Sequence, residues 1–301
     1  MKKLTSILLI LILTLSLAAC GSNGKKDPVK IGIPDDGTNL SRAIKLLETA
    51  GFITVKPEAG YTPQMADITG YLYNIEIVPT QANGLPATLD DFAASTINGT
   101  YAIPAGLTPS KDALIIEKQS ESGDNPYVNI IAARSADKDN PTYKTIVAAY
   151  QTQLVAQFLL ENYKEAFFPA FAYDSKYSVD ENFAKDILNY KSDKTGKTVV
   201  KVGVCGANND QWIAVQKVLD EQNAGIYIEL VEFDAYNLPN EALNSGDIDL
   251  NAFQHKAYMN SEIASQGYKI ESIGDTLIAP LSLYSKQVTS LDALKDLAGK
   301  K

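Results

Sequence analysis

The sequence is poor in the residues that catalysis and metal binding most often use. Its 301 residues include one histidine, two cysteines and one tryptophan. A single histidine, His255, argues against a histidine-based zinc site and against a histidine-dependent catalytic triad. The patterns GxSxG, HExxH and GxxxxGK[ST] are absent as well. We therefore expect no catalytic residue, no metal and no cofactor, and an enzyme is the weakest functional hypothesis.

The first cysteine, Cys20, lies in a segment typical of secreted lipoproteins. It follows two lysines, an apolar run over residues 7–17 and a pair of alanines. This order indicates a signal peptide, and the run is shorter than the ~20 apolar residues of a membrane-spanning helix. We predict that residues 1–19 are removed, that Cys20 is acylated and that residues 20–28 form a tether. The protein would then be anchored to the lipid bilayer at the extracytoplasmic face of the cell membrane. An uncleaved anchor is the alternative.

The second cysteine, Cys205, is left without a partner, so no disulfide is expected. It follows the strand-like residues 199–204, a position where a nucleophile could stand. Because no second cysteine and no nearby histidine would activate it, a small buried thiol is the favoured interpretation.

Basic residues are outnumbered by acidic ones, which gives a formal net charge of −9. Removal of residues 1–19, which carry two lysines and no acid, makes this −11. An acidic surface argues against nucleic acid as a partner. The length and the apolar content of 45% are enough for two lobes of roughly 100–150 residues each, and we expect a monomer.

Predicted strands and helices alternate along the chain, which favours an α/β fold. Residues 29–34 form a strand, after which Thr38 or Asn39 caps a helix that Gly51 ends. The same unit recurs later, with a strand over 199–204, cap candidates at 208–210 and a helix from 211. Two such starts predict two lobes, each a doubly wound sheet with ligand sites at the carboxyl ends of the strands.

Arg42 is the strongest candidate for binding an anion. We predict that it lies in the first turn of its helix, where a cation opposes the helix dipole. Such a position is tolerated more readily when an anion is held nearby, and a helix N-terminus with a guanidinium fork suits a carboxylate. The alternative is a solvated or salt-bridged surface arginine.

Aromatic and amide residues supply further candidates. Phe253, His255 and Tyr258 lie within the segment FQHKAY, and Tyr236 is placed to join them. Aromatic rings make favourable contacts with a thioether sulfur, although the same rings could simply be core. Asn98 and Asn129 belong to TINGTY and YVNI, which we predict to be short strands that end at the cleft, where an amide can both donate to and accept from an amino acid.

Several blocks of the sequence carry a family pattern. They include IPDDGTNLSRA at 33–43, TINGTYAIPAGLTPSKDAL at 96–114, NPYVNIIAAR at 125–134, VVKVGVCGANND at 199–210 and GDIDLNAFQHKAY at 246–258. They resemble the methionine-binding lipoproteins of bacterial ABC importers, the NlpA or MetQ-like family, over residues 29–172 and 199–301. The two halves stand in the opposite order to the family's. The resemblance therefore implies a circularly permuted chain in which residues 173–198 are the joining linker. A fusion of two half copies with swapped lobes is the alternative.

The resemblance also implies a fold and a function. The fold would be the two-lobed periplasmic-binding-protein type, with lobe two at 29–125 and 286–301, lobe one at 126–285 and the ligand cleft between them. The protein would deliver L-methionine, or a related amino acid or methionyl peptide, to the permease and ATPase of an ABC importer. The implied ligand residues are Arg42, Asn39, Asn98, Thr100 in place of a family asparagine, Asn129, Tyr236, Phe253, His255 and Tyr258. A surface scaffold or adhesin on the same fold is the alternative.

Overall fold

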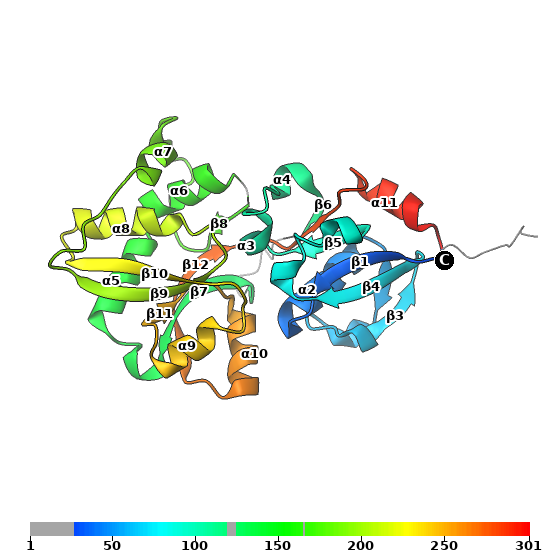
Figure 1. The fold of residues 1–301 in the computed structure, drawn as a ribbon, viewed down its shortest axis with the longest axis horizontal. Helices are drawn as coiled ribbons and strands as arrows, with labels where there is room; N and C mark the ends of the chain where they lie inside the picture. Colours follow the sequence, from blue (N-terminus) through cyan, green and yellow to red (C-terminus); the bar gives the residue numbers. More distant parts are fainter. Residues whose placement is uncertain (1–26, 119–124, 165) are drawn as a thin grey trace, which may run out of the picture.

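A computed structural model describes residues 27–118, 125–164 and 166–301 of the chain. Two α/β lobes lie side by side, and each is built on one twisted sheet (Figure 1). The predicted signal peptide, Cys20 and most of the predicted tether lie outside the described residues. Within those described ranges, no helix combines the length and the apolar character that a membrane span requires.

Lobe two contains the five-stranded sheet β4-β1-β5-β13-β6. Ile31 and Ile33 of β1 point to one face, where they pack against α2, while the opposite face is covered by a second apolar cluster that includes Leu85 and Phe92. Successive side chains of a strand point to opposite faces of the sheet, so β1 is buried on both faces. The strands are β1 Val29–Pro34, β4 Ile75–Thr80, β5 Ala94–Ile97, β6 Ala113–Ile116 and β13 Ser282–Tyr284, with a separate hairpin β2 Ile53–Val55 and β3 Ile68–Tyr71. The helices are α2 Gly37–Thr49, α3 Gly99–Ala102, α4 Pro109–Asp112 and α11 Leu291–Ala298.

Lobe one contains the six-stranded sheet β10-β9-β11-β7-β12-β8. In β7, Ile131 and Ala133 face the cluster under α5, α6 and α8, whereas Ile130 and Ala132 face α9 and α10. Helices therefore cover both faces (Figure 1). The strands are β7 Val128–Arg134, β8 Phe168–Pro169, β9 Thr198–Cys205, β10 Ile226–Phe233, β11 Leu250–Asn251 and β12 Ile270–Ile278. The helices are α5 Pro141–Tyr150, α6 Gln153–Tyr163, α7 Phe183–Leu188, α8 Gln211–Glu221, α9 Pro239–Ser245 and α10 Lys256–Gln266.

Five strands of each sheet follow the same order, and the sheet of lobe one has β8 as a sixth strand at its edge. Each sheet contains one antiparallel inserted strand: β13 between β5 and β6, and β7 between β11 and β12. Both inserted strands follow directly after the chain has left the other lobe. The chain thus crosses between the lobes after β6 and again at residues 279–281. The second crossing was predicted after residue 285 and lies earlier, because Ser282–Tyr284 completes the sheet of lobe two.

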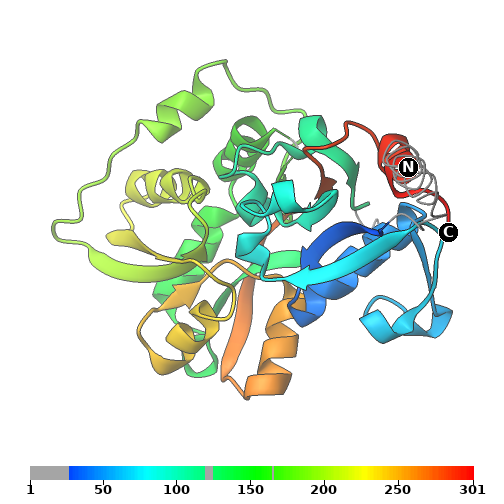
Figure 2. The ribbon, with the colours of Figure 1, turned by 45° about the vertical axis from the view of Figure 1, so that its right-hand side comes forward.

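The first described strand and the C-terminus meet at one loop of lobe two. The backbone N–H of Val29 donates to the carbonyl of Asn74, whose own N–H donates to Gly299 at 2.9 Å. Lys301 N donates to the carbonyl of Leu72 at 3.2 Å. Figure 2 shows the C-terminus on lobe two, away from lobe one. The start of β1 and the end of the chain therefore lie next to each other.

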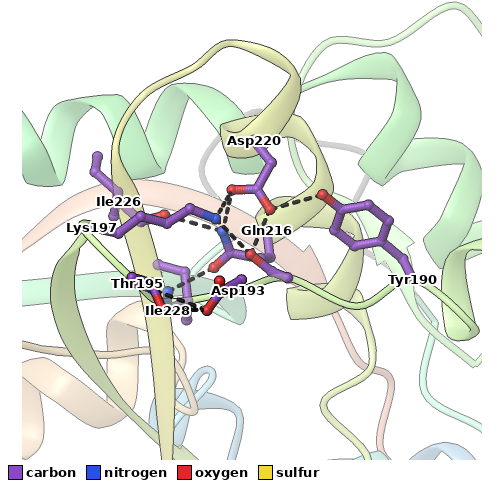
Figure 3. Close-up of polar contacts among 9 residues, drawn as sticks. Tyr190, Asp193, Thr195, Lys197, Gln216, Asp220, Ile226 and Ile228 are labelled. Atoms are coloured by element: carbon purple, nitrogen blue, oxygen red, sulfur yellow. Dashed lines mark hydrogen bonds and ion pairs between the residues drawn. The ribbon is translucent and has the colours of Figure 1, made fainter.

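Residues 173–198 pack against lobe one. Their helix, α7, buries Ile187 against α6 and α8. Beyond it, the carboxylate of Asp220 on α8 accepts hydrogen bonds from Tyr190, Ser192 and Lys197 at 2.6 to 2.8 Å (Figure 3). The segment is thus attached to lobe one through α7 and through the residues that follow it.

Candidate ligand site between the lobes

A pocket lies between the lobes, and its lining combines residues from both. It encloses about 350 Å³ of empty space, part of which is open to solvent. The structure brings all nine predicted ligand residues together here, although sequence separates the first from the last by most of the chain. The lining consists of Asn39, Arg42, Asn98, Gly99, Thr100, Asn129, Tyr236, Phe253, Gln254, His255, Tyr258 and Ala279.

The helix that carries Arg42 begins earlier than predicted. Asp36, not Thr38 or Asn39, is the N-cap of α2, and its carboxylate accepts from the backbone N–H of Asn39 at 3.0 Å and from its side-chain amide. A carboxylate suits this position because it accepts from free N–H groups and faces the positive end of the helix dipole. Arg42 consequently lies in the second turn, so the dipole argument for its position was wrong. Gly51 follows the end of the helix with φ of 77°, as predicted.

The guanidinium of Arg42 is buried, with 3% of its surface exposed, and most of its donors are already used. Nε and Nη2 donate to the two carboxylate oxygens of Glu117, at 3.0 and 2.5 Å. Nη2 also donates to the carbonyl of Ala279, and Nη1 donates to Oδ1 of Asn39, each at 3.1 Å. A guanidinium has five N–H groups, so one N–H on Nη1 is left for a ligand. The alternative prediction of a surface arginine is wrong, because Arg42 is buried. The salt bridge that this alternative allowed is present, and its partner is Glu117.

Glu117 and Tyr127 support this arrangement and were not among the predicted residues. Glu117 lies directly after β6, and Tyr127 lies directly before β7. The ring of Tyr127 covers the guanidinium face at 4.6 Å and meets the ring of His255 edge-on at 5.3 Å. Glu117 follows the apolar strand ALII, so a search for polar residues directly after predicted strands would have found it.

Three aromatic residues form one wall of the pocket. The ring centroids of Tyr236, Phe253 and Tyr258 are 6.0 Å apart in every pair. Burial raises the pKa of both tyrosines, so their hydroxyls stay neutral. Cys205 packs behind this wall as a free, buried thiol, and burial raises its pKa, which fits the predicted inert role. The wall offers an apolar, polarisable surface.

His255 lines the pocket and stabilises a helix with one of its ring nitrogens. As the N-cap of α10, its Nδ1 accepts from the backbone N–H of Tyr258 at 3.1 Å. Burial, and then the charge of Arg42, lower its pKa well below the usual value, so the ring is neutral. With Nδ1 as acceptor, the proton lies on Nε2. That buried Nε2 has no partner within the described ranges.

Asn98 offers the complementary group. Its amide nitrogen donates to Oδ1 of Asn39 at 2.9 Å, while its own buried Oδ1 has no partner among the residues described. The strand predicted in TINGTY is β5, and it ends at the pocket as predicted, but it stops at Ile97, and Asn98 is the N-cap of the short helix α3 that carries Thr100. The turn is tight: a Cβ on Gly99 would lie 2.9 Å from the ring of Phe167.

Asn129 enters from the opposite lobe, near the start of β7. The sequence predicted that this strand ends at the cleft. It begins there instead, because β7 runs antiparallel to its neighbours β11 and β12. An isolated bridge joins its backbone to that of His255, which keeps both residues at the pocket.

In the part of the chain that the structure covers, no group of three or more His, Cys, Asp or Glu residues is arranged to hold a metal ion.

The sequence model of the NlpA lipoprotein family matches residues 25–171 and 200–299, most of the chain. The protein belongs to the NlpA lipoprotein family. The matched NlpA regions leave out the predicted linker, for which no family counterpart was expected.

Among its NlpA relatives, the D-methionine-binding lipoprotein MetQ of Salmonella typhimurium is 45% identical over 132 residues, which are 43% of this chain and 47% of that protein. Outer membrane lipoprotein 3 of Mannheimia haemolytica is 41% identical over 141 residues, 47% of this chain and 52% of that protein. A nutrient-binding protein from Burkholderia cenocepacia, solved bound to methionine, is 36% identical over 48% of this chain and 60% of its own, with a TM-score of 0.44. The chain spans about half the length of the curated relatives it matches.

Proposed function

We propose that this NlpA family member is the lipid-anchored substrate-binding protein of an ABC importer and that its pocket binds L-methionine or a closely related amino acid. The observation that carries the proposal is the pairing of unused polar groups with an aromatic wall in one pocket. Arg42 and His255 each offer a free donor, and Asn98 offers a free acceptor. Buried polar groups are rarely left unpaired, so these three point to a polar ligand.

The chemistry of the pocket suits an amino acid with an apolar side chain. The ligand carboxylate accepts from Nη1 of Arg42 and from Nε2 of His255, both of which are donors. The ligand ammonium donates to Oδ1 of Asn98. A thioether side chain packs against Tyr236, Phe253 and Tyr258. The name of the Salmonella relative supports a methionine ligand. No bond is made or broken in this function.

Capture and release would use the two chain crossings as a hinge. One crossing holds Glu117 and the other holds Ala279 and Leu281, and a bound ligand would contact residues of both lobes. The closed, loaded protein would deliver its ligand to the permease and ATPase, while acylation at Cys20 keeps it, as a monomer, at the extracytoplasmic face of the membrane.

Thermal unfolding of residues 21–301 with a panel of amino acids and methionyl dipeptides tests the proposal. A ligand at 1,000 times its dissociation constant should stabilise the folded protein by about 4 kcal/mol, which gives a clear rise in melting temperature. Selective stabilisation by L-methionine supports the proposal, and selectivity for another amino acid would assign a change of specificity to Thr100. A cooperative transition that no ligand moves would favour the scaffold or adhesin.

A further inference from the structure

The pair formed by Arg42 and Glu117 fixes the charge of the pocket before any ligand arrives. The carboxylate of Glu117 accepts from Nε and Nη2 of Arg42, the two donors that form one fork of the guanidinium. A ligand carboxylate cannot use that fork while Glu117 holds it. The ligand therefore meets an arginine whose positive charge is already balanced by a carboxylate.

Glu117 is held in this position from the side of the hinge. Its Oε2 also accepts from the backbone N–H of Leu281 at 3.0 Å, and its own N–H donates to the carbonyl of Leu281 at 2.8 Å. Arg42 reaches the same crossing through its bond to Ala279. The pair is thus bonded to both segments that connect the lobes, and Glu117 has little freedom to leave the guanidinium.

The other charged groups near the pocket do not restore a positive charge. His255 is neutral. Asp36 is an acid whose pKa is raised by burial, and it bonds Asn39 rather than Arg42. The part of the pocket around Arg42, where the ligand's carboxylate and ammonium would bind, therefore carries one positive and at least one negative group. A ligand with only a carboxylate would bring an unbalanced negative charge into this buried site.

We infer that Glu117 is a positioning and specificity-determining residue, which makes the pocket select ligands that carry an ammonium as well as a carboxylate. This inference rests on the proposed amino-acid binding. Glu117 acts through Arg42: it leaves only the Nη1 edge for the ligand and cancels the charge that would otherwise attract any anion. Selection against simple carboxylic acids follows from that cancellation.

Three ligands that share the methionine side chain test the inference by titration calorimetry. They are L-methionine, its deaminated analogue 4-(methylthio)butanoate, which is an anion, and methioninol, which is a cation. In the unaltered protein both analogues should bind more weakly than methionine by about 100-fold, the scale on which unpaired buried polar groups are rejected, and within about tenfold of each other. An anion that binds as well as methionine would overturn the inference without any variant.

In Glu117→Gln, the anion should gain on the cation by at least about tenfold, because a full charge next to a guanidinium changes its interactions by that much. Glu117→Asp, which keeps the charge, should retain the original ratio. Glu271→Gln removes an exposed glutamate paired with Lys138 in lobe one and is the matched control. An unchanged ratio in Glu117→Gln, with methionine still bound, overturns the inference alone. Failure of the unaltered protein to bind any amino acid overturns the proposed function as well.

Discussion

The two ring nitrogens of His255 connect the pocket to the stability of α10. Nδ1 accepts from the N–H of Tyr258 at the start of the helix, and Nε2 of this pocket-lining residue is buried without a partner among the described residues. Protonation would remove the Nδ1 acceptor and place a cation beside Arg42. Both the burial of the ring and the nearby guanidinium oppose that protonation. A single side chain thus links helix capping, ligand binding and pH.

The pH dependence of stability should reveal this residue. The folded-state pKa of His255 is depressed, so below about pH 6.5 the unfolded chain binds a proton that the folded protein does not. The free energy of unfolding should therefore fall as the pH drops from 7 to 5, with a slope approaching about 1.4 kcal/mol per pH unit. Urea unfolding at several pH values measures it.

His255→Gln is the matched variant, because His255 is the only histidine in the chain. With no histidine left to titrate, the fall in stability from pH 7 to pH 5.5 should be lost, because the partly buried acids Asp36 and Glu262 have raised pKa values and act in the opposite direction. An equally steep slope in the variant would show that the depressed pKa does not govern acid stability.

At the residue scale, the sequence predicted which side chains line the pocket better than how they are held there. Arg42, His255 and the aromatic residues were identified through their motifs, and the structure brings them into one pocket. Glu117 was not, because its pairing with Arg42 bridges 75 residues and depends on how β6 ends beside α2. No local pattern contains that information. The ligand roles of the lining residues remain predictions.

At the scale of elements, the sequence was reliable where a strand leads straight into a helix. Strand β9, the Asp210 cap and the start of α8 lie where they were predicted. Predictions were less accurate at the pocket, where β5 gives way to α3 after four residues and β7 starts instead of ending. These elements are short, and their geometry depends on the strands with which they pair: β13 for β5, and β11 and β12 for β7. Local propensity alone could therefore not define them.

The linker over residues 173–198 should be a stabilising element. Asp220→Ala removes the acceptor for Tyr190, Ser192 and Lys197. Burial, and then the hydrogen bond to Asp220, raise the pKa of Tyr190 to about 12. We expect the free energy of unfolding to fall by about 1–2 kcal/mol and proteolysis after α7 to accelerate.

Ligand affinity should stay unchanged in Asp220→Ala, because no residue of this network lines the pocket. Asp193→Ala is the control, since Asp193 lies in the same segment and accepts hydrogen bonds from Thr195, within its own loop. Equal proteolysis rates in the two variants would contradict a specific role for Asp220.

At the scale of the whole molecule, chain order and three-dimensional order differ. Five strands of each sheet follow the same order, yet the strand of lobe one that corresponds to β1 is β9, in the middle of the chain, while β7 and β8 of the same sheet come from earlier sequence. The start of β1 and the C-terminus share the loop at residues 72–74. We propose that the chain is a circular permutant, as the reversed order of its family blocks predicts. The swapped fusion makes a different prediction about assembly.

Rejoining the chain in family order tests the permutation. A protein that runs from Val199 to Lys301, continues through about 2–6 added residues to Val29 and ends at residue 172 should fold as a monomer, because a short connection suffices between ends that lie close together. It should give the same ligand-induced rise in melting temperature as the natural order. Light scattering reports the mass of both proteins. A natural chain that is a dimer, together with a rejoined chain that is a monomer, would instead identify lobes exchanged between two molecules, because permutation within one molecule leaves the mass unchanged.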